Sequence, residues 1–143
     1  DPAILTPHLV EMARLTGKSV RTISEDLIDS CRSFASQHHL ICVQKDARTV
    51  VSDGSHVFLN TTGNSGMATG GSGDVLTGIL LGLLAQRPTP FESAVAAVTL
   101  HGLAGDAAAS SRSSYSMIAG DIAEQVGTVL LDAENQTNLF LLS

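Results

Sequence analysis

The stretch that decides the fold reads Asn64-Ser65-Gly66-Met67-Ala68-Thr69-Gly70-Gly71-Ser72-Gly73-Asp74-Val75-Leu76-Thr77-Gly78. Glycine allows positive φ and lets the backbone approach a ligand closely. A helix that begins near Ser72 points its free N–H groups and the positive end of its dipole into the loop before it. Such a place binds phosphate without a cationic side chain. The stretch therefore predicts an anion cradle with a base, Asp74, at its edge; the cradle residues are Gly70, Gly71, Ser72 and Gly73.

Other interpretations of this loop are simpler. A glycine-rich turn could merely join a hairpin to a helix, but the nearby hydroxyls and the apolar helix behind them favour anion binding. The loop lacks the Gly-Lys-Ser/Thr ending of a Walker loop and the last glycine of a dinucleotide-binding GxGxxG. Asp74 could act only as an acidic residue that the helix dipole favours. As a base it would accept a proton from a substrate hydroxyl.

Composition limits the class of protein. The chain has 143 residues, enough for one domain, and 43% of them are apolar. Its net charge of −6 argues against non-specific nucleic-acid binding. The longest apolar run, 75–85, is shorter than the ~20 residues of a membrane span. Cys31 and Cys42 lack CxxC spacing, which favours reduced thiols in a cytoplasm. We expect a cytoplasmic protein that uses neither nucleic acid nor membrane. No His, Cys or carboxylate pair has metal-ligand spacing, so no metal ligand is predicted.

Periodicity and capping patterns predict helices interleaved with short strands, hence an α/β fold. A capping box at 22–25 would open one helix through residue 35. Gly78 and Gly82 are spaced for close packing of their helix against a sheet. Ile4-Leu5 resembles the end of a strand already under way, and we expect a missing upstream portion. The expected helices are 8–15, 22–35, 72–84, 89–109 and 119–131, and the expected strands are 40–45, 49–52, 56–60 and 139–142.

Two further residues are candidates for ligand contact. His8 follows Thr6-Pro7 at the end of the first strand-like segment, where α/β proteins usually bind ligands; it could instead be a solvated or helix-capping histidine. Lys45 ends the next strand, four residues before Thr49, and could equally be a surface charge. His101, inside an alanine-rich helix, is predicted to be a packing residue.

These motifs together resemble one known family. The resemblance rests on the long glycine motif and on its flanking segments: Thr6-Pro7-His8 with Glu11-Met12, Lys45 to Thr49, Leu84-Ala85-Gln86, His101-Gly102-Leu103-Ala104-Gly105-Asp106 and Ala119-Gly120-Asp121-Ile122. The family is the YjeF C-terminal domain family of ADP- or ATP-dependent NAD(P)H-hydrate dehydratases, which have a ribokinase-like fold. The glycine motif, which begins at Asn60, is more specific than the short Gly-x-Gly-Asp that ribokinase-like sugar and vitamin kinases share.

The resemblance implies a layered α/β/α fold in which residues 1–143 form the C-terminal portion of a dehydratase domain. It implies a lyase that repairs hydrated NADH or NADPH (NADHX, NADPHX): ADP or ATP, with Mg²⁺, would phosphorylate the hydrate hydroxyl, and loss of phosphate would restore the cofactor. The partners it implies are the missing N-terminal half of the domain and further copies of the same chain. Without that half, the chain is expected to bind nucleotide weakly or to be inactive.

The resemblance also implies roles for particular residues. Asp74 would contact the hydrate and activate its hydroxyl, and His8 would contact the hydrate. The amides of residues 70–73 would hold the transferring phosphate. The nucleotide would be bound by Lys45, Asp46, Ala47, Arg48, Thr49 and Gly73.

The chain departs from the family pattern at two places. Leu9-Val10 stands where the family usually has Pro-Gly, and Asp46 stands where a glycine usually follows the lysine. Two alternatives stay open at this stage. One is a ribokinase-like kinase for a vitamin precursor or a sugar, and the other is a nucleotide-binding module without catalysis.

Overall fold

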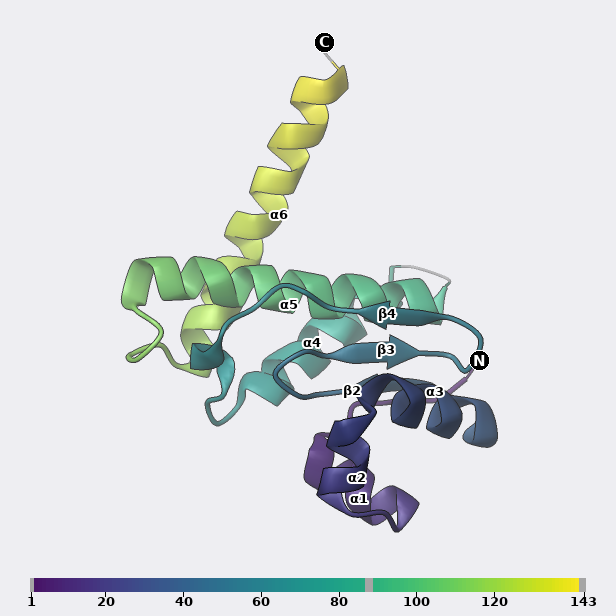
Figure 1. Cartoon of the computed structure of the whole chain (residues 1–143). Helices are drawn as coiled ribbons and strands as arrows, with labels where there is room; N and C mark the ends of the chain where they lie inside the picture. Colours follow the sequence, from purple (N-terminus) through teal and green to yellow (C-terminus); the bar gives the residue numbers. More distant parts are fainter. Residues whose placement is uncertain (1, 87–88, 142–143) are drawn as a thin grey trace. The chain divides into compact units, whose positions relative to one another are not determined.

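The computed structural model describes residues 2–86 and 89–141. They group into two compact units, one made of Asp1–Thr61 with Leu80–Val98 and one made of Thr62–Ile79 with Thr99–Ser143. The chain passes between the units three times: once after Thr61, once inside α4 (Ser72–Leu84) and once inside α5 (Pro90–Arg112); both helices are labelled in Figure 1. The α/β class predicted from the sequence is confirmed.

The first unit contains a four-stranded sheet in the order β1-β2-β3-β4. Its strands are β1 (Ile4–Leu5), β2 (Ile41–Gln44), β3 (Val50–Ser52) and β4 (Val57–Leu59). β1 runs parallel to β2, while β2–β3 and β3–β4 are antiparallel. The strands expected at 40–45, 49–52 and 56–60 are confirmed, each shorter by one or two residues.

Three helices lie between β1 and β2 in the chain: α1 (Leu9–Thr16), α2 (Val20–Glu25) and α3 (Leu27–His38). The single helix expected over 22–35 is wrong, because the helix is interrupted at Asp26, whose backbone has the non-helical angles φ −142° and ψ 74°. The Asp26 carboxylate accepts a hydrogen bond from the Asp29 N–H at 3.0 Å and so caps α3. Ser19, and not Thr22, caps α2.

The core of the first unit lies between α3 and the sheet. α3 packs against β2 and β3, as Figure 1 shows. Strand residues alternate between the two faces: Cys42 and Val50 join this core, whereas Ile41, Val43 and Val51 are buried on the opposite face. The buried core residues are Met12, Ile23, Cys31, Phe34, Ala35, Leu40, Cys42 and Val50.

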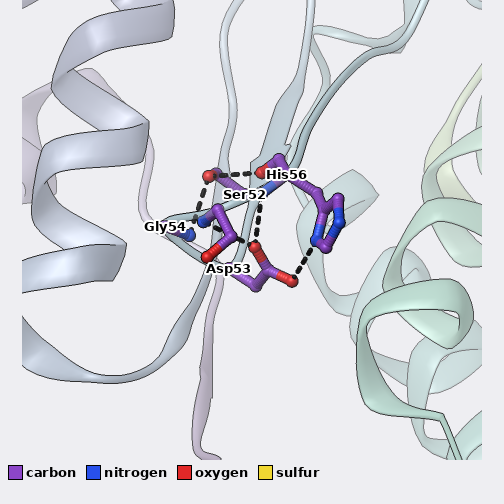
Figure 2. A network of polar contacts seen from close by, with 5 residues as sticks. Ser52, Asp53, Gly54 and His56 are labelled. Atoms are coloured by element: carbon purple, nitrogen blue, oxygen red, sulfur yellow. Dashed lines mark hydrogen bonds and ion pairs between the residues drawn. The ribbon is translucent and has the colours of Figure 1, made fainter.

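The turn between β3 and β4 confirms the hairpin predicted at Asp53-Gly54 (Figure 2). One Asp53 carboxylate oxygen accepts the N–H groups of Ser55 at 2.8 Å and His56 at 2.6 Å, and the other lies 2.9 Å from His56 Nδ1. Burial raises the pKa of Asp53, but the backbone and ring hydrogen bonds of His56, the Ser55 bond and the His56 charge outweigh it, so the pKa lies below its usual value.

The second unit contains a short 3₁₀ helix, η1 (Ser65–Met67), the first part of α4, most of α5 and α6 (Ala119–Leu141). Its buried core residues are Ala104, Ala108, Met117 and Ile122. The strand expected at 139–142 is wrong over 139–141, which continue α6, and Leu142 lies outside the described residues. No glycine or proline follows Gly127 to end the helix.

The glycines of α4 do not lie at a close contact. A Cβ on Gly78 or Gly82 would meet nothing within 4 Å among the described residues, so the close packing expected at these two positions is wrong.

Within residues 2–86 and 89–141, no helix has both the length and the apolar character that crossing a membrane requires.

Candidate anion and ligand site

The glycine loop of the second unit begins with a polar clamp. Gly63, at φ +99°, donates its N–H to Asp106 Oδ2 at 2.9 Å. The Asn64 Nδ2 group donates to Asp106 Oδ1 and to the Gly105 carbonyl, both at 3.0 Å. Asn64 Oδ1 in turn accepts the Gly66 N–H at 3.0 Å. The start of the loop is therefore attached to α5 through one carboxylate.

Close backbone approach explains two of the glycines here. A Cβ on Gly66 would lie 2.5 Å from the Ser114 carbonyl oxygen, and one on Gly102 would lie 2.8 Å from the Thr62 carbonyl carbon. Both neighbours are backbone atoms, which cannot rotate away. The loop consequently lies flat on α5 and on the segment that follows it, within the second unit.

The loop ends in the first turn of α4, as the sequence predicts. Gly71, at φ +88°, has a carbonyl that accepts the N–H groups of Asp74 at 3.0 Å and Val75 at 3.1 Å. The Ser72 N–H donates to the Thr69 carbonyl at 3.2 Å, so its amide is already engaged. Among the described residues, nothing accepts a hydrogen bond from the amides of Gly70, Gly71 and Gly73. Three of the four predicted cradle amides are free donors.

Asp74 is exposed in the first turn of α4. Its carboxylate makes no hydrogen bond or ion pair with any residue that the structure describes. Ser72, by contrast, is buried, and its hydroxyl lies 3.3 Å from His101 Nε2. The cradle therefore presents N–H donors and one carboxylate outward, while its serine faces inward to α5.

The first unit brings His8 and Lys45 together. They face each other in an isolated parallel bridge, and the Lys45 N–H donates to the Pro7 carbonyl at 2.8 Å. Both residues follow the carboxyl ends of parallel strands, which is the edge where α/β sheets bind ligands. The Lys45 side chain is half-buried, and its ammonium has no hydrogen bond or ion pair with the residues described.

His8 also caps α1. Its Nδ1 accepts the Glu11 N–H at 3.3 Å, and Glu11 Oε2 accepts the His8 N–H at 2.8 Å. With Nδ1 accepting, the ring proton is assigned to Nε2, which lies 3.4 Å from Glu11 Oε1. The His8 backbone bond lowers the pKa of Glu11, burial raises it, and the charges of His8, Lys45 and Arg14 lower it again, so that the pKa lies below its usual value. His8 is therefore a helix-capping residue, as one of the two interpretations expected, and its side chain is half exposed.

The remaining predicted nucleotide contacts occupy the turn between β2 and β3. Asp46, Ala47 and Arg48 are exposed there, and the Thr49 carbonyl accepts the Asn60 N–H at 2.9 Å. The structure thus places His8 and residues 45–49 in the first unit, and residues 70–74 in the second.

Sequence reasoning gave no role to Asn64 and Asp106 and treated His101 as a packing residue. The signal that identifies them is the His101–Asp106 motif, in which Gly102 lies against the Thr62 backbone and Gly105 lies against the Met67 side chain. Within the described part of the chain, no group of three or more His, Cys, Asp and Glu side chains could hold a metal ion.

Comparison with known proteins gives a consistent result. A sequence profile described as NAD(P)H-hydrate dehydratase matches residues 1–127. The bifunctional NAD(P)H-hydrate repair enzyme Nnr of Moorella thermoacetica is 44% identical over 137 residues, which cover 94% of this chain and 26% of that protein.

Solved structures agree with the sequence comparison. The ADP/ATP-dependent NAD(P)H-hydrate dehydratase of Bacillus subtilis, co-crystallised with ATP/Mg²⁺ and soaked with CoA, superposes with a TM-score of 0.88 at 32% identity. A ribokinase-like superfamily protein of Enterococcus faecalis gives 0.78 at 34% identity. The two superpositions cover 92% and 90% of this chain, but 49% and 44% of those chains. The chain therefore has the ribokinase-like fold over about half the length of these relatives.

Proposed function

Because the chain belongs to the NAD(P)H-hydrate dehydratase family, we propose that it takes part in nucleotide-dependent dehydration of hydrated NADH or NADPH. The observation that carries this proposal is the cradle at the start of α4. Three free amides, of Gly70, Gly71 and Gly73, lie next to an exposed, unpartnered Asp74 carboxylate. Amides at a helix start bind phosphate oxygens, and a free carboxylate can accept a hydroxyl proton.

The proposed chemistry has two steps. The hydrate hydroxyl oxygen attacks the terminal phosphorus of ADP or ATP, its proton passes to the Asp74 carboxylate, and AMP or ADP leaves. The new phosphate ester then loses inorganic phosphate together with a proton from the neighbouring carbon, which restores the double bond of the reduced cofactor. The amides of Gly70, Gly71 and Gly73 stabilise the charge of the transferring phosphoryl group.

We propose that the bridge residues of the first unit act in binding. Lys45 has a free ammonium to meet phosphate, and residues 46–49 and Gly73 complete the nucleotide contacts. His8 would contact the hydrate through Nε2, since Nδ1 is engaged in the cap of α1. Mg²⁺ would be carried by the nucleotide phosphates and supplies charge neutralisation there; the cradle donors are N–H groups, which suit phosphate oxygens and not a cation.

The partners and location are proposals of the same kind. We propose that residues 1–143 are the C-terminal portion of a longer domain, because superposition covers about half of the solved relatives. We also propose a homo-oligomer, since Leu130 and Leu131 on α6 are 47% and 55% exposed. The two free cysteines support a reducing, cytoplasmic location.

Replacement of Asp74 by Asn tests the function. In the full-length protein, Asp74→Asn should lower the ADP- or ATP-dependent return of reduced-nicotinamide absorbance from NADHX by about 10²- to 10⁴-fold, the usual contribution of a general base. The control is Asp29→Asn, another exposed acidic residue in a first helical turn. It should leave turnover unchanged.

Each alternative outcome has a clear meaning. Full turnover by Asp74→Asn would refute the base. ATP consumption with a vitamin precursor or a sugar, but not with the hydrate, would favour the kinase alternative. Nucleotide binding without phosphate release would identify a non-catalytic module.

A further inference from the structure

We propose that Asp106 is a positioning residue that sets the place of the glycine loop, and through it the place of the cradle amides. This inference rests on the function proposed above. Asp106 touches neither the cradle nor Asp74. It acts at the other end of the loop, on Gly63 and Asn64.

The hydrogen-bond geometry uses both carboxylate oxygens separately. Oδ2 accepts a backbone N–H from Gly63 at 2.9 Å, and Oδ1 accepts a side-chain N–H from Asn64 at 3.0 Å. Asn64 links Asp106 to the next part of the loop, because its side-chain oxygen accepts the Gly66 N–H. A continuous chain of hydrogen bonds thus runs from α5 into η1.

Only a group with two acceptors and no donor fits this position. No Lys, Arg or His within the described residues lies within ion-pair distance of Asp106, so N–H donors alone compensate its charge. Hydrogen bonds to an ionised acceptor are about twice as strong as neutral ones. An amide at this position would turn one N–H toward another N–H, and a donor would be left unsatisfied.

The part of the loop that carries the cradle has few contacts of its own. A Cβ on Gly70 would find nothing within 4 Å, whereas Gly66 and Gly102 have backbone neighbours under 3 Å away. Asp106 holds the start of the loop, Gly66 and Met67 pack against the second unit's core in its middle, and the Ser72–His101 contact holds the first turn of α4. Release of the start loosens η1 and lets the free amides that follow it shift. A displacement of about 1 Å in a site that orients reactants can lower the rate about 10²-fold.

The test combines a disruptive variant with a polarity exchange. Asp106→Asn removes one acceptor. The double variant Asp106→Asn with Asn64→Asp lets the amide introduced at 106 donate to the carboxylate introduced at 64, which also still accepts the Gly66 N–H. The exchange is partial, because the carboxylate loses the Asn64 donation to the Gly105 carbonyl. The control is Asp53→Asn, because Asp53 is likewise a carboxylate that accepts two backbone N–H groups, in the hairpin of the first unit.

Two measurements are made on each variant. Amide hydrogen exchange should become about tenfold faster at the hydrogen-bonded amides of Gly63, Gly66, Met67 and Ala68 in Asp106→Asn, with no change in α5, and should be partly restored in the double variant. In the full-length protein, kcat should fall about 10- to 100-fold, while the nucleotide KM changes much less. Asp53→Asn should change neither quantity in the loop.

The outcomes separate this inference from the proposed function. Unchanged exchange at Gly63, Gly66, Met67 and Ala68 in Asp106→Asn would overturn the positioning role. If the wild-type protein does not dehydrate the hydrate but the exchange pattern follows expectation, the positioning role stands and the proposed function fails.

Discussion

Replacement of Gly66 by alanine probes the tightest backbone contact of the glycine loop. The added Cβ would lie 2.5 Å from the Ser114 carbonyl oxygen and 2.9 Å from the Ser114 Cα. Because these are backbone atoms, the loop or the segment after α5 must move. Overpacking of this kind costs about 1–3 kcal/mol. At roughly 3 °C per kcal/mol for a chain of this length, Gly66→Ala should lower Tm by about 3–9 °C.

Gly70 offers a matched control four residues away in the same loop. Its φ lies outside the positive range, and a Cβ there would meet nothing within 4 Å. Alanine at this position restricts the unfolded chain, so Gly70→Ala should leave the free energy of unfolding unchanged or raise it by up to about 1 kcal/mol.

Urea unfolding followed by circular dichroism measures both variants. The midpoints should move in opposite directions, or only that of Gly66→Ala should move, with equal m-values. A Gly66→Ala variant within about 0.5 kcal/mol of wild type would refute the contact argument, as would a Gly70→Ala variant that loses as much stability as Gly66→Ala.

Three other predictions concern the first unit. The pKa of Asp53 lies below its unfolded value of about 3.9, so its carboxylate stabilises the fold above that value and this contribution disappears as pH falls through the folded pKa. Asp53→Asn should therefore flatten the acid limb of stability against pH; an unchanged limb would contradict the cause given for the shift. Asp26→Ala removes the cap of α3 and should cost about 1 kcal/mol in urea unfolding, whereas a loss below ~0.3 kcal/mol would mean that solvent replaces the cap. Cys31 and Cys42 are fully buried, and the neighbouring Cys31 thiol together with burial raises the pKa of Cys42. Both thiols should react with an aromatic disulfide reagent only at the rate of unfolding, and fast reaction in the native state would show an opening at α3.

The elements that the sequence predicts well are those specified by local chemistry. The hairpin at Asp53-Gly54 and the start of α4 at Ser72 follow from turn and helix-start preferences that act over a few residues. The break at Asp26 was missed because apolar spacing continues from Ile23 across it to Leu27. Hydrophobic periodicity reports which side chains share a face and gives no signal for a single residue with non-helical backbone angles.

The candidate site shows the same division between local and distant information. The cradle could be predicted because its glycines, its carboxylate and its helix are contiguous in sequence. Asp106 could not, because its partners Gly63 and Asn64 are joined to it only by the path of the chain in three dimensions. His8 illustrates a third case: its position at a strand end was predictable, but its bond to Glu11 depends on the start of α1 being one residue later than periodicity suggests.

The clamp at the start of the glycine loop has a consequence for the order of folding. Its hydrogen bonds join residues 42 and 43 positions apart, whereas β2 pairs with β3, and β3 with β4, across short turns. Closing a long loop costs more entropy than closing a short one, so contacts between distant residues form late. We expect the hairpins to be in place before α5 meets the loop. A chain with ordered β2–β3 and β3–β4 hairpins would then pass through a stage at which it cannot yet hold an anion.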